Sequence, residues 1–331
     1  MKTKWQEKLN GNPIPWLLES NPWTKYKVLT ELLNKPDSSS EVIAARQELI
    51  NHPQIQDLIK ETKDWLPKAP TRNNDSTISY YKLRMLTDFG LTIDDSGMKE
   101  IFEKATAHKI NNLFASRGTE PIKPQKDKPD PYADEWHISP CNSPIIIYSL
   151  LCLDPSNSQV KKAVEELKNR WKTKQGWFCH YFFVDGLFKK LQVGCQMAGL
   201  MALEVFSKVP ELKESIYAQN AYHPLKFHYD YGKTMYYFGR SKRFWTLKYP
   251  FVWYNALYLA EVLTRFEFVK NEKLVKELIK WIEQSQDNQG RFTPTSMFMA
   301  YKGWDFANKK EPSPWITFLC CRILKRWYNK Y

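Results

Sequence analysis

The chain of 331 residues is 43% hydrophobic and 15% aromatic, which is enough to bury a large core in one large or two ordinary domains. Its 12 glycines are too few for a sheet-rich fold with many tight turns. The formal net charge is +13, but charges of both signs are interspersed along the chain. We therefore interpret the excess as a solvated lysine-rich surface and do not expect a nucleic-acid partner.

The sequence predicts no membrane-spanning helix. No apolar stretch reaches the roughly 18 uncharged residues that a spanning helix needs, and no apolar signal core follows the first residues. We therefore expect no transmembrane segment and a cytoplasmic location. Because the cytoplasm keeps thiols reduced, the six cysteines are expected to be core thiols or metal ligands rather than disulfides.

A hydrophobic helix start recurs six times. In chain order the six starts read NPWTKYKVLTELL (from Asn21), DSTISYYKLRML (from Asp75), SPCNSPIIIYSLLCL (from Ser139), VGCQMAGLMALEVF (from Val193), YPFVWYNALYLAEVL (from Tyr249) and PSPWITFLCCRIL (from Pro312). Helical repeats of this kind must stack on one another, or close into a ring, to bury their apolar faces.

Each start is predicted to open a helical hairpin. The first helix of the third repeat is apolar on all sides, whereas the second carries a single stripe of Val160, Val164, Leu167 and Trp171. A helix that is apolar all round is buried, and a striped helix faces water on its other side. We therefore predict one all-α domain over residues 1–331, an (α/α)6-type toroid with inner and outer helix rings.

The loops indicate where a site lies. Turns from inner to outer helices are short, whereas the returns form long rim insertions at residues 115–140, 172–193, 222–250 and 293–312. In a closed toroid these returns lie at one end, where the inner helices begin. Long aromatic loops of this kind usually carry function, so we predict the site at that rim.

Two turns carry a recognisable motif. One is Gln175-Gly176-Trp177, and the other runs from Gln286 through Gly290 to Phe292 at the end of an outer helix. The second matches the Q-x3-G-x-W/F repeat of squalene–hopene cyclases. With the six helix starts, the chain resembles the terpenoid cyclase/protein prenyltransferase superfamily. More narrowly, NPIPWLLE, SPCNS, QGWFC, YPFVWYN and EPSPWIT resemble the prenyltransferase/squalene-oxidase repeat proteins of unknown function.

The resemblance implies an (α/α)6 toroid in which the Gln and the aromatic residue of the motif tie an outer helix to the next inner one. The resemblance does not imply an activity. The D-x-D-D acid motif of class II cyclases is missing, and the zinc pattern of the protein prenyltransferases has no clear match. Whether the chain is an enzyme therefore stays open.

The leading hypothesis is an aromatic central cavity that binds an isoprenoid or other apolar small molecule. The aromatic residues expected to contact the ligand are Trp136, Trp177, Trp253, Tyr254, Trp304 and Trp315. One alternative is a carbohydrate-active (α/α)6 hydrolase or lyase, which would need two facing carboxylates. The other is a non-catalytic binding module.

Three cysteines could converge on a metal. Cys141 begins the third inner helix, Cys195 begins the fourth, and Cys179 lies in the loop that leads into the fourth. Helix N-termini favour the thiolate, which is the zinc-binding form. His180 could complete a tetrahedral site for zinc, and His137 is the other candidate for the fourth ligand. The alternative is three separate thiols that fill space in the core.

Two aspartates are candidate catalytic acids. Asp185 and Asp305 each lie in an aromatic rim segment, within YFFVDG and GWDF respectively. The rim insertion 222–250 interleaves aromatic with basic residues, which suits a diphosphate head group on an apolar tail. The same composition can stack on single-stranded nucleic acid or simply pack as a lid.

Overall fold

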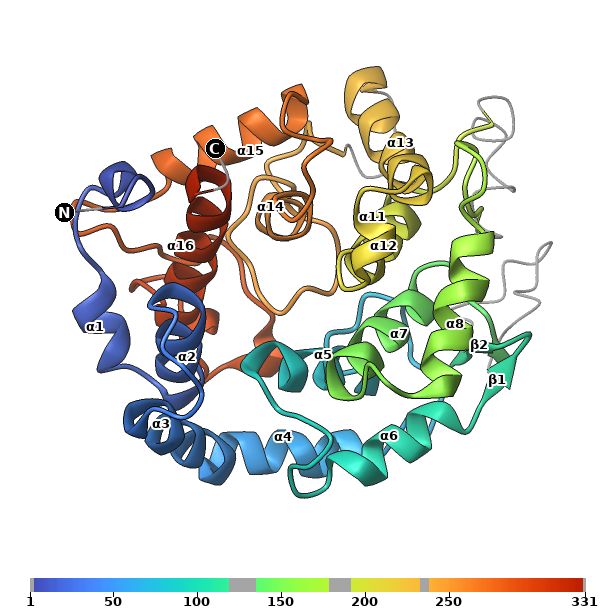
Figure 1. Ribbon diagram of the computed structural model, residues 1–331, viewed down its shortest axis with the longest axis horizontal. Helices are drawn as coiled ribbons and strands as arrows, with labels where there is room; N and C mark the ends of the chain where they lie inside the picture. The colour runs from blue at the N-terminus through green and yellow to red at the C-terminus, as the bar shows by residue number, and fades with distance from the viewer. Residues whose placement is uncertain (1–2, 119–134, 179–191, 233–237, 330–331) are drawn as a thin grey trace. The chain divides into compact units, whose positions relative to one another are not determined.

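The computed structural model describes residues 3–118, 135–178, 192–232 and 238–329 (Figure 1). Within these ranges the protein is mostly helical, with two pairs of two-residue strands, so the prediction of a helical fold is confirmed. The chain divides into two compact units, residues 1–56 with 231–331, and residues 57–230. None of the described helices is long and apolar enough to cross a membrane. Closure of the hairpins into one toroidal domain stays a prediction.

The first unit contains the N-terminal and the C-terminal parts of the chain. Its elements are η1 (Gln6–Lys8), α1 (Ile14–Leu18), α2 (Pro22–Lys27), the π-helical η2 (Val28–Leu32), α3 (Ser40–Asn51), α14 (Ala256–Leu263), α15 (Lys273–Gln284), η4 (Met299–Tyr301), η5 (Asp305–Ala307) and α16 (Pro314–Asn329). Helix α16 packs against α2, η2 and α14 (Figure 1).

The second unit contains the middle of the chain. Its elements are α5 (Ser79–Phe89), α6 (Met98–Thr106), β1 (Lys109–Ile110), β2 (Leu113–Phe114), β3 (Ser116–Arg117), β4 (Trp136–His137), α7 (Asn142–Leu153), α8 (Ser158–Asn169), α11 (Gln196–Phe206) and α12 (Pro210–Lys213). The antiparallel pairs are β1 with β2 and β3 with β4. Helix α7 packs between α5 and α11 (Figure 1). Two further helices, α4 (Pro53–Lys63) and α13 (Ile216–Tyr231), contain the points where the chain passes from one unit to the other.

All six predicted helix starts produce helices. They are α2, α5, α7, α11, α14 and α16 in chain order. Helices α11 and α14 are buried along their whole length, and α7 is buried except at Cys152. Helix α8 buries only the stripe that contains Val160, Val164 and Leu167. The predicted difference between an all-round apolar helix and a striped helix is therefore confirmed within the hairpins.

One predicted loop is partly a helix. The rim insertion 222–250 begins inside α13, which continues to Tyr231 and contains Pro224. A proline inside a helix removes one backbone hydrogen bond, which favours a break at that point in the sequence. Here Ala218, Ala221 and Leu225 are fully buried along one face of the helix. The burial of this apolar face outweighs the local cost of the proline.

The turn from Gln286 to Phe292 joins three segments. The Gln286 side chain accepts a hydrogen bond from the backbone N–H of Asn10 (2.8 Å) and donates one to the carbonyl of Lys8 (2.9 Å). The backbone N–H of Phe292 donates to the Thr317 hydroxyl on α16 (2.9 Å). The aromatic position of the motif thus ties the end of α15 to α16, while its glutamine holds the N-terminal segment.

A buried charge network joins three helices of the first unit. Glu261 on α14 is fully buried and pairs with the guanidinium groups of Arg265 (2.8 Å), Arg322 (2.9 Å) and Arg326 (2.8 Å). Arg322 also pairs with Glu31 on η2 (2.8 Å). Burial alone would raise the pKa of Glu261, but the charges of Arg322, Arg326 and Arg265 outweigh burial and hold that pKa well below its ordinary value.

The second unit contains a smaller network of buried charged residues. Arg84 on α5 pairs with Glu204 on α11, and its Nε lies 3.4 Å from Asp88. Arg84 and Glu204 are 1% and 0% exposed, so neither charge has access to bulk water. Such a pair tolerates little displacement, because a buried charge that loses its partner costs several kcal/mol.

We predict that Glu261→Gln lowers the free energy of unfolding by about 3–5 kcal/mol at pH 7, because three guanidinium groups lose their buried counter-ion. The depressed pKa makes this contribution present above about pH 4.3, where the unfolded carboxyl titrates, and it is lost as the pH falls through the folded pKa. Urea unfolding at several pH values measures both effects.

Glu277→Gln is the matched control for that experiment. Its carboxylate lies on the surface of α15, 3.8 Å from the exposed Lys273, so a change below about 0.5 kcal/mol is expected. Equal effects of the two substitutions would contradict the importance of the buried network.

A second prediction concerns the N-terminal segment. Gln286→Ala removes both side-chain bonds to Lys8 and Asn10 and should cost about 1–2 kcal/mol of stability. Hydrogen exchange at the Asn10 amide should accelerate more than exchange in the core of α15. Gln289→Ala in the same turn changes an exposed side chain and should leave that amide protected.

Candidate functional site

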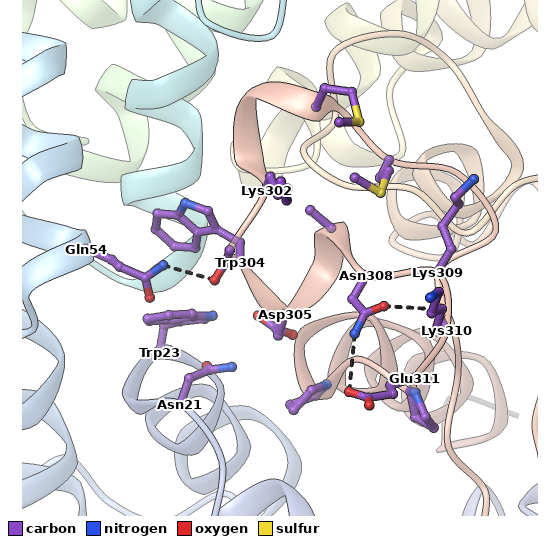
Figure 2. Close-up of a pocket in the computed structure, with 16 residues that line it drawn as sticks. Asn21, Trp23, Gln54, Lys302, Trp304, Asp305, Asn308, Lys309, Lys310 and Glu311 are labelled. Carbon is purple, nitrogen blue, oxygen red and sulfur yellow. Dashed lines mark hydrogen bonds between the residues drawn. The ribbon is translucent and has the colours of Figure 1, made fainter.

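A pocket of about 720 Å³ lies in the first unit (Figure 2). Residues from the N-terminal part of the chain line one side, and the rim insertion 293–312 lines the other. The N-terminal contribution consists of Asn21, Trp23 and Gln54. The rim contribution includes Trp304 and Asp305, which the sequence predicts as a ligand contact and an acid. The pocket therefore joins residues about 250 positions apart.

Two tryptophans form the aromatic wall of the pocket. The ring centroids of Trp23 and Trp304 are 5.1 Å apart, and Trp23 also packs edge-on against His52 at 5.3 Å. The Gln54 amide donates to the carbonyl of Gly303 (3.4 Å), next to Trp304, as Figure 2 shows. This bond and the ring contact fix the rim segment against the N-terminal helices. An aromatic wall of this kind offers a large apolar contact area to a ligand.

Asp305 lies where the pocket meets the start of α16 (Figure 2). Its Oδ2 accepts hydrogen bonds from the Ser313 hydroxyl (2.6 Å) and the backbone N–H of Trp315 (2.9 Å). Its Oδ1 is buried and has no hydrogen-bond partner among the described residues. Burial raises the pKa of this carboxyl above its ordinary value, although the bonds from Ser313 and Trp315 act in the opposite direction.

Three lysines line the solvent-exposed edge of the pocket, which is its mouth. Lys302, Lys309 and Lys310 all line it and are exposed. Asn308 orders this stretch, since its side chain donates to Glu311 (3.2 Å) and accepts from the backbone N–H of Lys310 (3.0 Å). The mouth therefore carries three positive charges against the single carboxylate of Glu311. Such a mouth attracts anionic groups.

The other predicted aromatic contacts lie elsewhere. Trp315 is fully buried and packs on Tyr249 at 5.5 Å, while Tyr254 is buried among other aromatic rings. Trp253 is half-buried beside Tyr254. In the second unit, the predicted aromatic residues have their own partners. Trp136 stacks on His108 at 3.6 Å, and Trp177 lies under the guanidinium of Arg170 at 5.3 Å.

The predicted metal ligands are only partly described. Cys179 and His180 lie outside the described residues, as does the candidate acid Asp185. Cys141 and Cys195 directly precede α7 and α11, two helices that pack against each other in the second unit. In the described part of the chain, no three residues among His, Cys, Asp and Glu form a group that could hold a metal ion. Zinc therefore stays a prediction.

Sequence reasoning missed the N-terminal side of the pocket. Asn21 and Trp23 belong to the start of α2 and Gln54 belongs to α4, and nothing local distinguishes them from packing residues. A weak signal was available in Trp23, a large aromatic residue one position after the proline that opens α2. Its partner across the pocket could not be inferred, because that contact depends on the tertiary fold.

Comparison with known proteins adds no relative. No model of a known protein family matches the chain, and no curated protein matches it. The chemistry of the pocket therefore has to be inferred from its own residues.

We predict that Asp305→Asn is at least as stable as the wild type at pH 7. Folding raises the pKa of Asp305, so the protonated carboxyl favours the folded state below about pH 4, and this contribution is lost as the pH rises through the folded pKa. Asparagine cannot ionise and avoids that loss. The difference in free energy of unfolding between Asp305→Asn and the wild type should become smaller as the pH falls. Urea unfolding at pH 4.5 and pH 7.5 would measure it.

Asp305→Ala is the contrasting variant. It removes the acceptor for both Ser313 and Trp315 and should cost about 1–3 kcal/mol at either pH. A large loss of stability for Asp305→Asn at neutral pH would show that the ionised carboxylate, rather than its hydrogen bonds, holds the start of α16.

Proposed function

We propose that the protein binds an isoprenoid-type small molecule in the pocket between Trp23 and Trp304, with an anionic head group at its lysine-lined mouth. The observation that carries the proposal is the combination, in one pocket, of a tryptophan wall and three exposed lysines. An apolar chain gains from the aromatic contact, whereas a diphosphate gains from the positive charge. The pocket volume of about 720 Å³ suits a ligand of that size.

The proposed function is binding rather than a defined reaction. Asp305 lines the pocket and burial raises its pKa, which suits a proton donor to a ligand. Both hydrogen bonds to its Oδ2, however, serve the first turn of α16. Together with the missing D-x-D-D motif, this dual role leads us to assign Asp305 to ligand contact and not to catalysis.

The helical hairpins support a terpenoid cyclase/prenyltransferase-like architecture. In the first unit, α14 is fully buried and is followed by the striped helix α15. In the second unit, α7 is followed by α8 in the same manner. In the turn from Gln286 to Phe292, the backbone N–H of Phe292 bonds to Thr317 on α16, which supports a tie between α15 and α16, whereas the Gln286 side chain bonds to the N-terminal segment. We propose that these hairpins close into an (α/α)6-type toroid.

A carbohydrate-active function has less support. Such an enzyme needs two carboxyl groups that face one bond. The pocket contains Asp305 and Glu311, but Glu311 is exposed at the mouth and bonded to Asn308. The two carboxyl groups therefore occupy different chemical environments. Asp305 bonds to the start of α16, and Glu311 bonds to Asn308.

Isothermal titration with geranyl diphosphate tests the proposal. We expect saturable binding to the wild type, and binding about 10–100-fold weaker for Trp304→Ala, because the aromatic wall contributes about 1.5–3 kcal/mol. Lys309→Glu combined with Lys310→Glu should weaken geranyl diphosphate but leave geraniol unchanged, since only the diphosphate contacts the lysines.

Trp245→Phe is the matched control for that titration. Trp245 is half-buried in the same unit, packs on Trp281 and does not line the pocket, so its substitution should leave the affinity unchanged. Saturable binding of an oligosaccharide, with none of geranyl diphosphate or geraniol, would replace the proposal with the carbohydrate-active alternative.

A further inference from the structure

Two methionines of the rim insertion 293–312 line the pocket. Met297 and Met299 flank Phe298, whose backbone is extended with φ −99° and ψ 126°. Side chains on either side of an extended residue point to the same side of the chain, so both thioethers belong to the pocket wall. The Phe298 ring belongs to the opposite side, where the Lys248 Nζ lies 3.4 Å from its centroid.

Met299 is far more exposed than the other described methionines. It is 71% exposed, whereas Met297 is half-buried. The remaining methionines within the described residues lie in helices of the second unit and are at most 1% exposed; they are Met85, Met98, Met197 and Met201. Among these thioethers, a reagent in solution therefore reaches Met299 first.

The backbone at Met299 is held in place although its side chain is exposed. Met299 opens the single turn η4, and its carbonyl accepts a hydrogen bond from the backbone N–H of Lys302 (3.1 Å). Tyr301 in the same turn is 4% exposed and packs on Phe306, with ring centroids 6.0 Å apart. The turn leads directly to Lys302 and Trp304, which line the pocket with it (Figure 2). A chemical change at the Met299 side chain therefore alters the pocket edge while its buried anchor stays in place.

Oxidation of a thioether changes its affinity for apolar groups. The unoxidised side chain is apolar and flexible, so it adapts to an apolar ligand. A sulfoxide at the same position is polar and accepts hydrogen bonds from water. An apolar ligand that covers the sulfoxide removes that water and offers no hydrogen bond in return, which is unfavourable.

We propose that Met299 is an oxidation site, at which a hydroperoxide converts the thioether to a sulfoxide and thereby weakens the binding of apolar ligands to the pocket. The exposure of this one methionine and its place in the pocket wall carry the inference. The effect on the ligand rests on the proposed function, whereas the oxidation itself does not.

The reaction is a single oxygen transfer. The Met299 sulfur attacks one oxygen of hydrogen peroxide, so that an S–O bond forms and the O–O bond breaks. The electron pair of the broken bond leaves with the other oxygen, which takes up the proton of the transferred oxygen and departs as water. In total, one thioether is oxidised to a sulfoxide and one hydrogen peroxide is reduced to water.

The test treats the full-length protein with hydrogen peroxide and follows sulfoxide formation over time by proteolysis and mass spectrometry. We expect Met299 to be oxidised before Met297, and at least about tenfold faster than the four buried methionines. Geranyl diphosphate and the apolar anion anilinonaphthalene sulfonate should both bind the oxidised protein about 5–10-fold more weakly. Methionine sulfoxide reductases with dithiothreitol as the reductant should restore the affinity.

Variants separate Met299 from the other oxidisable side chains. Met299→Leu keeps an apolar wall but cannot form a sulfoxide, so it should bind both ligands and be insensitive to peroxide. Met299→Gln introduces a polar side chain and should weaken both ligands without peroxide. Met297→Leu is the matched control and should keep the peroxide sensitivity. All three variants contain the same six cysteines, so a loss of affinity through thiol oxidation would also appear in Met299→Leu.

Two results would overturn the proposal. The first is a sulfoxide at Met297 or at a buried methionine before one at Met299. The second is a peroxide effect on affinity that is the same in the wild type and in Met299→Leu, whether a loss or no change. A failure of geranyl diphosphate to bind the untreated protein would contradict the proposed function alone, because mass spectrometry and the sulfonate titration still test the inference.

Discussion

Charged residues buried between helices are the constraint on which both units depend. Glu261 is fully buried on α14 and is held by three guanidinium groups, two of them on α16. In the other unit, Arg84 and Glu204 pair between α5 and α11. An apolar surface permits many helix registers of similar energy, but a buried charge is tolerated only where its partner is in reach. These pairs therefore select one rotation and one translation for each helix.

The position of α16 in turn determines the pocket. Once the network around Glu261 fixes this helix, its first turn is the anchor for the rim segment before it. Phe292 bonds to Thr317, and Asp305 accepts from Ser313 and Trp315, so both ends of the rim segment are attached to α16. The tryptophan wall is thus held by the same helix that carries the charge network, and the pocket is a consequence of core packing rather than of loop chemistry.

Each unit places reactive groups where helices begin. In the first unit the start of α16 meets the carboxyl of Asp305, and in the second Cys141 and Cys195 directly precede α7 and α11. The backbone N–H groups of a first helical turn lack partners within the helix, so they stabilise sulfur or oxygen anions nearby.

The sequence by itself determined where the helices begin, which of them are apolar on all sides, and that Asp305, Trp304, Cys141 and Cys195 lie near helix starts. These features follow from local periodicity and from proline and cysteine positions, which the chain displays without folding. Only the tertiary structure decided that Trp23 faces Trp304, that α13 continues through Pro224, and which arginines surround Glu261. Glu261 in LYLAEVL and Arg322 in LCCRIL are charged residues within apolar runs, which is a weak signal of a buried charge. Packing between distant segments determines the partner of such a charge, and no local pattern predicts that partner.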